Sequence, residues 1–254
     1  RAPLGTLAGV SGFQINFGST DVFTPGDLCD VLVVMNAAAL KKNLSRLKQR
    51  GTIIVNISGF DKRNLRLAGI DENENPLNNN SLEGFKVHKI DVTKLTRESL
   101  VNTSLSTKER DRCKNMFVLG FVYWMYNRSL SSSIEFLNLK FKSKPEILEA
   151  NVTVLKAGYH FADTSEIFSN RYEVKPAKMS KGLYRNIIGN QAIALGLIAA
   201  SKKSKLDLFY GGYPITPASD ILHELAKYKN FGIKTFQAED EIAGICSCIG
   251  ASFG

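Results

Sequence analysis

The segment from Gly211 to Ser219 combines two prolines, two hydroxyl side chains and a pair of glycines between an apolar run and a helical pattern. Prolines three residues apart restrict the backbone to a rigid turn, and Thr216 or Ser219 could cap the helix that follows. A helix N-terminus offers free N–H groups to anions. The spacing therefore predicts an anion site, although an ordinary strand-to-helix loop with a capping hydroxyl has the same pattern.

A second segment, Gln237 to Glu241, places acidic side chains directly after a predicted strand. Acidic residues in the first turn of a helix complement the helix dipole, which is their ordinary explanation. Glu239, however, follows the carboxyl end of its strand, as Thr216 follows its own. Because parallel strands share one carboxyl edge, we expect both polar groups to face one crevice, which is a candidate ligand site.

The elements that must position these residues alternate in type. Apolar patterning predicts helices over 192–202 and 218–227 and from 240 onward, and strands over 206–210 and 233–237. These elements are too few to bury a sheet on both faces. The chain begins with Arg1 and the apolar helical pattern still runs at Gly254, so we expect an internal fragment of a longer polypeptide.

The N-terminal part also predicts an α/β arrangement. A short alternating run over 13–17 indicates a half-buried strand. Val31 to Met35 is an apolar run of the kind buried on both faces, followed by Asn36, a helix to about residue 50 and a strand over 52–56 that ends at Asn56. Strand, helix and strand form a parallel crossover unit, which puts both asparagines where such sheets bind ligands.

The remaining patterns complete a first domain. The pattern predicts a loop over 71–84, a strand over 85–92, and helices over 107–126, over 132–142 and from 145 to about 158 or 161. The hydrophobic pattern lapses between Tyr172 and Arg185. We therefore expect one domain over 1–175, a linker over 176–186 and a second domain over 187–254.

Composition excludes several classes of protein. The chain has 254 residues, 44% hydrophobic and 22% charged, which is incompatible with a disordered chain or a small disulfide scaffold. A net charge of +9 is spread along the chain without a nucleic-acid-binding motif, so we expect no nucleic acid partner. No apolar stretch is long enough for a bilayer, so we expect no membrane association.

Cysteines and histidines do not suggest a metal site. Four cysteines are too few and too poorly spaced for a disulfide framework, which predicts a reducing, cytoplasmic location. None of the histidines has an acidic or cysteine partner at ligand spacing. They are His88, His160 and His223. We expect no metal ligands in this chain.

Several motifs together resemble a known family. The sequence is similar to the start of the α chain of 2-oxoacid:ferredoxin oxidoreductases, especially the two-subunit 2-oxoglutarate type, with a γ-type domain fused before it. The segments that carry the resemblance are Pro25-Gly26-Asp27, Asp30-Val31-Leu32-Val33 with Asn36, Lys114-Asn115-Met116-Phe117, Tyr123-Trp124-Met125-Tyr126-Asn127, Gly189-Asn190-Gln191-Ala192, Tyr213-Pro214-Ile215-Thr216-Pro217-Ala218-Ser219 and Gln237-Ala238-Glu239-Asp240-Glu241-Ile242-Ala243.

The resemblance implies a fold and a site. It implies a γ-type α/β domain followed by a truncated, pyrimidine-type α/β domain with a parallel sheet that binds thiamine diphosphate. It places Glu239 at the glutamate that hydrogen-bonds the aminopyrimidine ring, which favours the tautomer that removes the thiazolium C2 proton. A largely buried carboxyl with a raised pKa suits this role. Thr216 would face the 2-oxoacid carboxylate, within a substrate-binding segment formed by Tyr213, Pro214, Ile215, Thr216 and Pro217.

The resemblance also implies partners. Asn36 is a candidate contact for coenzyme A, which the γ-type domain helps to cover. The sequence has neither a Gly-Asp-Gly…Asn motif for the diphosphate and Mg²⁺ nor a cysteine run for an iron–sulfur cluster. Both are expected on a β subunit, without which this chain is inactive. We expect a dimer of αβ heterodimers that reduces ferredoxin, and the basic surface could attract acidic ferredoxin or the phosphates of coenzyme A.

The expected reaction is oxidative decarboxylation of 2-oxoglutarate to succinyl-CoA. Two alternatives remain open on the residues alone. A relative of the same family could act on pyruvate or another 2-oxoacid, and a scaffold subunit could keep the fold without the chemistry. The presence of both Thr216 and Glu239 favours an enzyme, because a scaffold need keep neither.

Overall fold

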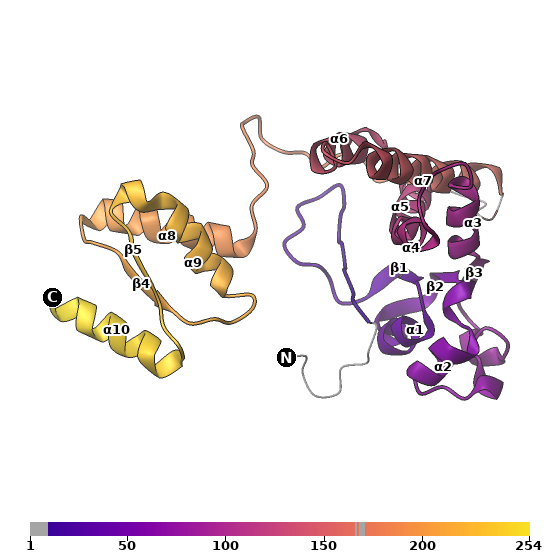
Figure 1. Ribbon diagram of the computed structural model, residues 1–254, viewed down its shortest axis with the longest axis horizontal. Coiled ribbons are helices and arrows are strands. Elements are labelled where there is room, and N and C mark those ends of the chain that lie inside the picture. The colour runs from indigo at the N-terminus through magenta and orange to yellow at the C-terminus, as the bar shows by residue number, and fades with distance from the viewer. Residues whose placement is uncertain (1–9, 166, 168–170) are drawn as a thin grey trace. The chain divides into compact units, whose positions relative to one another are not determined.

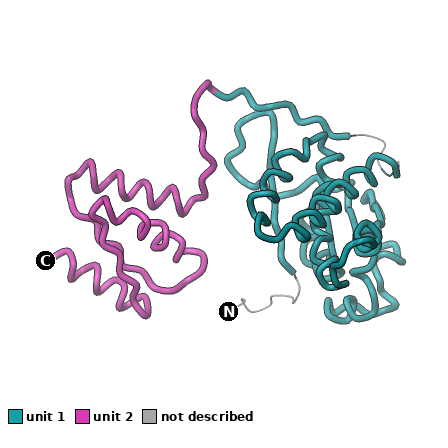
Figure 2. Tube along the Cα trace, turned by 45° about the horizontal axis from the view of Figure 1, so that its top comes forward, with its two compact units in different colours: residues 1–179 teal, residues 180–254 magenta. Residues whose placement is uncertain are grey.

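The computed structural model describes residues 10–165, 167 and 171–254, so the first nine residues of the predicted first domain lie outside the described residues. The chain falls into two compact units, residues 1–179 and residues 180–254 (Figure 2).

A parallel three-stranded sheet forms the centre of unit 1. The strands are β1 (Cys29–Val34), β2 (Leu47–Asn56) and β3 (Lys86–Ile90), in the spatial order β1-β2-β3. Helix α1 (Ala37–Asn43) connects β1 to β2. The predicted strand–helix–strand crossover is confirmed, and it places the carboxyl ends of all three strands at one edge.

Helices cover both faces of this sheet (Figure 1). Helices α1 and α2 (Lys62–Leu67) lie on one face, where their apolar residues join Ile53 and Val55 of β2 in a buried cluster. Ile54 points to the other face and joins a second cluster. Alternate side chains of a strand point to opposite faces, and so the central strand is buried on both sides.

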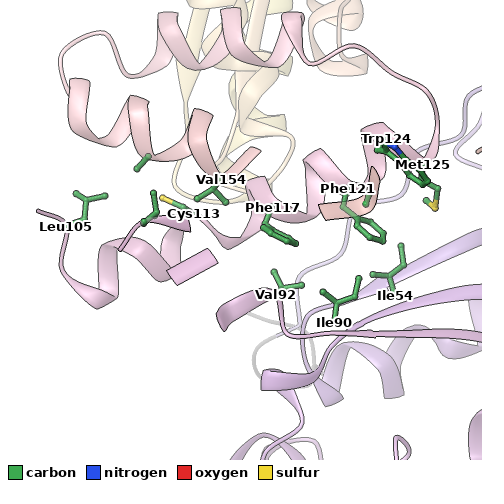
Figure 3. Packing of buried hydrophobic residues seen from close by; sticks show 13 residues of the cluster. Ile54, Ile90, Val92, Leu105, Cys113, Phe117, Phe121, Trp124, Met125 and Val154 are labelled. Carbon is green, nitrogen blue, oxygen red and sulfur yellow. The ribbon is translucent and has the colours of Figure 1, made fainter. Parts of the chain in front are cut away.

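The second face of the sheet carries the longer helices. They are α3 (Val92–Ser99), α4 (Thr107–Arg112), α5 (Lys114–Met125), α6 (Ser131–Lys140) and α7 (Pro145–Thr164). Figure 3 shows the rings of Phe117 and Phe121 of α5 directed toward Ile54, Ile90 and Val92. This layer of apolar contacts holds α5 against the sheet. Helix α7 packs on the side of α5 that faces away from the sheet, so α5 is apolar around most of its circumference.

Some sequence-based expectations for unit 1 are wrong. Residues 13–17 form no strand, because the part of this arm that is described pairs with no neighbouring backbone. The helix expected over 107–126 is divided at Cys113 into α4 and α5, and α1 ends well before residue 50. Among the strands of the described residues, β1 lies at the edge and is only partly buried, whereas β2 is enclosed on both faces. Helices α2 and α3 were not predicted.

Short helical turns complete the chain. They are η1 (Leu44–Arg46), η2 (Ile57–Gly59), η3 (Glu72–Glu74), η4 (Asn80–Leu82) and η5 (Ala226–Phe231). Two of them, η3 and η4, lie within the predicted loop over 71–84.

Unit 2 contains a smaller parallel sheet. Strands β4 (Phe209–Gly212) and β5 (Lys234–Gln237) pair in parallel, which confirms the expected α/β class for this part as well. The helices are α8 (Gly189–Ser204), α9 (Ser219–Leu225) and α10 (Glu241–Phe253). Its buried core is small and consists of Ala194, Ile198, Leu225 and Ile233. In the described parts of both units, no helix combines the length and the apolarity needed to span a bilayer.

Candidate functional site

The parallel pairing of β4 and β5 brings two polar loops to one edge of the unit 2 sheet. Gly212 lies opposite Gln237 at the ends of the strands. The backbone N–H of Ala238 donates to the carbonyl of Gly212 at 2.7 Å, which extends the pairing by one residue into the loops. The loop with Thr216 and the loop with Glu239 therefore leave the sheet side by side, as the sequence predicts.

Ser219 closes the first loop on itself. Its hydroxyl accepts a hydrogen bond from the N–H of Ile215 and donates one to the carbonyl of the same residue, each at 2.9 Å. The expectation that Ser219 or Thr216 caps α9 is wrong, because Ala218 is the N-cap residue and no side chain caps this helix. The turn uses the serine hydroxyl, while Thr216 stays exposed and the Thr216–Pro217 peptide bond is cis.

Two residues that lie in the quoted motifs, but for which no structural role was predicted, support this loop. The side-chain amide of Asn190, in the first turn of α8, donates to the carbonyl of Pro217 at 3.0 Å. At Gly211, a Cβ atom would lie 3.0 Å from the backbone carbonyl of Gly244 and 2.7 Å from Sγ of Cys248, so a glycine here favours the close approach of α10 to β4. The signal for Asn190 was its presence in the Gly189-Asn190-Gln191-Ala192 motif, whereas nothing in the sequence indicated the α10 contact.

Glu239 lies in the second loop with its carboxylate exposed. The expectation of a largely buried carboxyl is wrong for this chain, because the loop lies at the open edge of a two-stranded sheet. The next residue, Asp240, accepts a hydrogen bond from the N–H of Ala243 at 2.8 Å and so caps α10. The cap fixes the end of the loop at Asp240, and Glu239 is the residue directly before this cap.

Tyr213 connects the loop after β4 to the beginning of α10. Desolvation raises the pKa of its phenol, and a hydrogen bond to the carboxylate of Glu241, together with the negative charge of that group, raises it further. The phenol therefore stays protonated at neutral pH and can donate a hydrogen bond. Because Tyr213 follows β4 and Glu241 begins α10, this interaction links the loop after β4 to the first residue of α10.

The asparagines of unit 1 are engaged in the fold. Asn36 accepts a hydrogen bond from the N–H of Ala39 at 2.8 Å and caps α1. Asn56 is 2% exposed, and its amide donates to the hydroxyl of Thr93 at 3.2 Å. Both lie at the carboxyl edge of the sheet as predicted, and both stabilise the connections that leave this edge.

No candidate metal centre is present in the described part of the chain, where no group of three or more histidine, cysteine or acidic side chains could hold an ion. All four cysteines are free thiols. Burial raises the pKa of the Cys113 thiol. Such a thiol is a poor nucleophile and belongs to the core.

Comparison with known proteins places each part of the chain. Residues 6–161 match the family described as "Pyruvate ferredoxin/flavodoxin oxidoreductase". Residues 200–254 match the one described as "Pyruvate flavodoxin/ferredoxin oxidoreductase, thiamine diP-bdg". The second match contains both loops at the carboxyl edge of unit 2.

Individual relatives agree with these matches. The 2-oxoglutarate oxidoreductase subunit KorA of Mycobacterium tuberculosis is 50% identical over 254 residues, which is 100% of this chain and 39% of that protein. The α subunit of 2-oxoacid:ferredoxin oxidoreductase 1 of Aeropyrum pernix is 29% identical over 157 residues, or 58% of this chain and 23% of that subunit.

A solved structure is similar over most of the chain. It is the 2-oxoglutarate:ferredoxin oxidoreductase from Magnetococcus marinus with 2-oxoglutarate, coenzyme A and succinyl-CoA bound, with a TM-score of 0.67 and 26% identity. The match covers 92% of this chain and 36% of that one. The chain thus spans well under half the length of these relatives.

Proposed function

The chain belongs to the pyruvate ferredoxin/flavodoxin oxidoreductase family, and from this premise we propose that it is part of the α subunit of a 2-oxoglutarate:ferredoxin oxidoreductase. The observation that carries the proposal is the meeting of the Thr216 and Glu239 loops at one sheet edge, within the segment that matches the thiamine diphosphate-binding family. The reaction is oxidative decarboxylation of 2-oxoglutarate to succinyl-CoA with reduction of ferredoxin.

The residues at this edge fit thiamine diphosphate. In the described residues, neither the Thr216 hydroxyl nor the Glu239 carboxylate has a hydrogen-bond partner, and both are exposed at the edge. A carboxylate with free lone pairs can accept a hydrogen bond from a ring nitrogen. When bound, the cofactor supplies a nucleophilic carbon and an electron sink for decarboxylation.

Each residue of the site has a distinct role in this proposal. Glu239 holds the proton that it shares with the aminopyrimidine ring. Thr216 donates a hydrogen bond from its hydroxyl to the carboxylate of the 2-oxoacid. Tyr213, anchored by Glu241, shapes the substrate-binding segment over 213–217. Asn36 contacts coenzyme A, although its side-chain oxygen already caps α1.

Other parts of the enzyme complete the reaction. We propose a β subunit that holds the diphosphate with Mg²⁺ and an iron–sulfur cluster, and a dimer of αβ heterodimers that passes electrons to ferredoxin. The free thiols agree with a reducing cytoplasm.

The test uses the full-length α chain co-expressed with its β subunit and purified without oxygen. Coenzyme A-dependent reduction of a low-potential dye is measured with 2-oxoglutarate and with pyruvate. Loss of the carboxylate in Glu239→Gln should lower kcat by about 10²-fold or more. Loss of the hydroxyl in Thr216→Ala should raise KM for 2-oxoglutarate about tenfold, because a hydrogen bond to a charged group is lost.

Glu135→Gln is the matched control, because it removes an exposed carboxylate of α6 in unit 1. Faster turnover with pyruvate than with 2-oxoglutarate would show that pyruvate is the substrate. If the complex is folded and carries the cofactor but turns over no 2-oxoacid, the chain belongs to a scaffold subunit and not to an enzyme.

A further inference from the structure

The Thr216 side chain has no support of its own. It is exposed, and its hydroxyl has no hydrogen-bond partner in the described residues. A hydroxyl that binds a ligand must be held within about 0.5 Å of its working position. The position of this hydroxyl therefore depends on the backbone on either side of Thr216, at Ile215 and at Pro217.

On the side of Ile215, the loop is held by Ser219. The Ser219 hydroxyl bonds both the N–H and the carbonyl of Ile215, each at 2.9 Å, and the N–H of Ser219 donates to the same carbonyl at 2.9 Å. These bonds fix the shape of the turn. They connect it only to the first residue of α9, and so they do not tie it to the rest of unit 2.

On the side of Pro217, the anchor comes from another helix. The side-chain amide of Asn190 donates to the carbonyl of Pro217 at 3.0 Å, and 27 residues separate the two along the chain. Within the described residues, no other hydrogen bond joins residues 214–218 to a part of unit 2 outside this loop and α9. Asn190 thus ties the turn to α8.

This anchor is rigid because α8 is packed into the core. Asn190, Ala194 and Ile198 are spaced four residues apart and therefore lie on one face of the helix. Ala194 is 0% and Ile198 is 7% exposed, and both join Leu225 of α9 in the buried cluster. Asn190 continues this stripe at the N-terminal end of α8, where its half-buried amide meets the loop.

A short path leads from this contact to Thr216. The pyrrolidine ring restricts φ of Pro217. The ψ angle of Pro217 is then the one freely variable torsion between the anchored carbonyl and the peptide bond that follows Thr216. A shift of the carbonyl therefore moves Thr216 as well, and a fixed carbonyl holds it in place.

We propose that Asn190 is a positioning residue for the 2-oxoacid, which acts through the carbonyl of Pro217 to hold the Thr216 hydroxyl where it can donate to the substrate carboxylate. The inference rests on the proposed function, because it uses the role assigned there to Thr216. It places Asn190 in substrate binding and gives it no part in the proton held by Glu239.

Steady-state kinetics of the full-length αβ complex test the inference. Asn190→Ala should raise KM for 2-oxoglutarate about three- to tenfold, which corresponds to one lost hydrogen bond. It should leave kcat unchanged, because the loss concerns binding of the substrate. Asn230→Ala is the matched control, since it removes an exposed amide of η5, which lies before the beginning of β5 and not at its carboxyl end.

Two further variants distinguish a hydrogen-bond donor from a side chain that only fills space. Asn190→Asp keeps the shape, but a carboxylate cannot donate to the carbonyl of Pro217. It should raise KM at least as much as Asn190→Ala does. Asn190→Gln keeps an amide donor on a longer side chain and should restore part of the affinity. A role in packing alone would instead leave Asn190→Asp close to the wild type.

A double variant shows whether Asn190 acts through Thr216. If it does, Asn190→Ala combined with Thr216→Ala should have the KM of Thr216→Ala alone, because the position of an absent hydroxyl has no effect. Hydrogen exchange gives a readout that does not depend on turnover. Peptides over 213–222 should exchange faster in Asn190→Ala than in Asn230→Ala, since the loop has lost its anchor.

The outcomes separate this inference from the proposed function. If Thr216→Ala raises KM but Asn190→Ala does not, or if the two effects multiply in the double variant, the inference is wrong and the proposed function stands. If Thr216→Ala leaves KM unchanged, the role of Thr216 is wrong and the inference is wrong with it. Loss of bound thiamine diphosphate in Asn190→Ala would also overturn the inference, because the residue would then serve the cofactor. If Asn190→Ala does not assemble with the β subunit, Asn190→Asp and Asn190→Gln decide by the same comparison.

Discussion

The polar residues of the two unit 2 loops are of two kinds. Some form hydrogen bonds that fix the backbone, and others have no hydrogen-bond partner in the described residues. Ser219, Asp240 and Asn190 lie within the motifs that resemble the family. The side chain of each forms a hydrogen bond with a backbone atom. Thr216 and Glu239 lie between them with no such partner in the described residues. The anchored residues set the path of the two loops, so that the free hydroxyl and carboxylate face the sheet edge together.

An ion pair in unit 1 gives a pH-dependent prediction at the same scale. Arg97 of α3 binds Asp111 of α4 through two hydrogen bonds, of 2.7 and 2.8 Å. The hydrogen bonds from Arg97 and its charge hold the pKa of Asp111 below its usual value. The stabilisation is therefore present above the pKa of the unfolded state and is lost as the pH falls through that of the folded state.

Asp111→Asn should lower the free energy of unfolding by about 0.5–1 kcal/mol at neutral pH, since the pair is partly exposed. The difference should shrink in acid, where Asp111 is protonated. Urea unfolding of unit 1 at several pH values measures this difference in the free energy of unfolding. Glu83→Gln is the control, because it removes an exposed carboxylate. A difference that stays constant with pH would contradict the assignment.

At the scale of elements, close backbone contacts decide where the helices lie. Helices α5 and α7 touch through two reciprocal glycines. A Cβ atom on Gly120 would lie 1.9 Å from the carbonyl of Leu155, and one on Gly158 would lie 1.9 Å from the carbonyl of Phe117. The layer that covers the unit 1 sheet therefore depends on these two positions.

Gly120→Ala should destabilise the protein by about 3 kcal/mol, because an overpacked core must move its helices apart. Gly196→Ala is the matched control, since a Cβ atom at this helical glycine of α8 meets nothing within 4 Å. It should stabilise its helix by about 0.5–1 kcal/mol. Thermal unfolding measures both, and equal effects of the two substitutions would rule out the close helix contact.

At the scale of the whole molecule, the chain is two compact units joined by a segment without regular structure. The beginning of this segment is fixed to unit 1, because Arg171 forms an ion pair of 2.6 Å with Asp163 and lies over the ring of Trp124. Beyond it, the exposed basic residues are Lys175, Lys178, Lys181 and Arg185, and the last three are not followed by proline. The boundary that we propose lies among these residues.

Limited digestion of the full-length α chain with trypsin should therefore cut first after one of these three residues. Lys175 precedes Pro176 and is a poor site for this enzyme. Mass spectrometry of the first fragments locates the cut. First cleavage within α5 or α7, or within β4 to α10, would refute the division.

The class of each unit and the order of most elements could be predicted from the sequence alone. Apolar runs and helical spacing predicted β2, β3, β5 and the longer helices, since these patterns report which side chains must be buried. The loops with Thr216 and Glu239 were also predicted to share an edge, because parallel strands leave no other arrangement.

Other features depend on contacts between distant parts of the chain and could not be predicted from local patterns. Three features depend on neighbours that are distant in the chain or on backbone angles. They are the position of β1 at the edge of the described sheet, the break between α4 and α5 at Cys113, and the hydrogen bonds of Ser219 within its own loop. A cavity beside Arg50 in unit 1 was invisible in the sequence for the same reason. Its lining residues come from six separate segments of the chain, and local patterns carry no information on which segments meet.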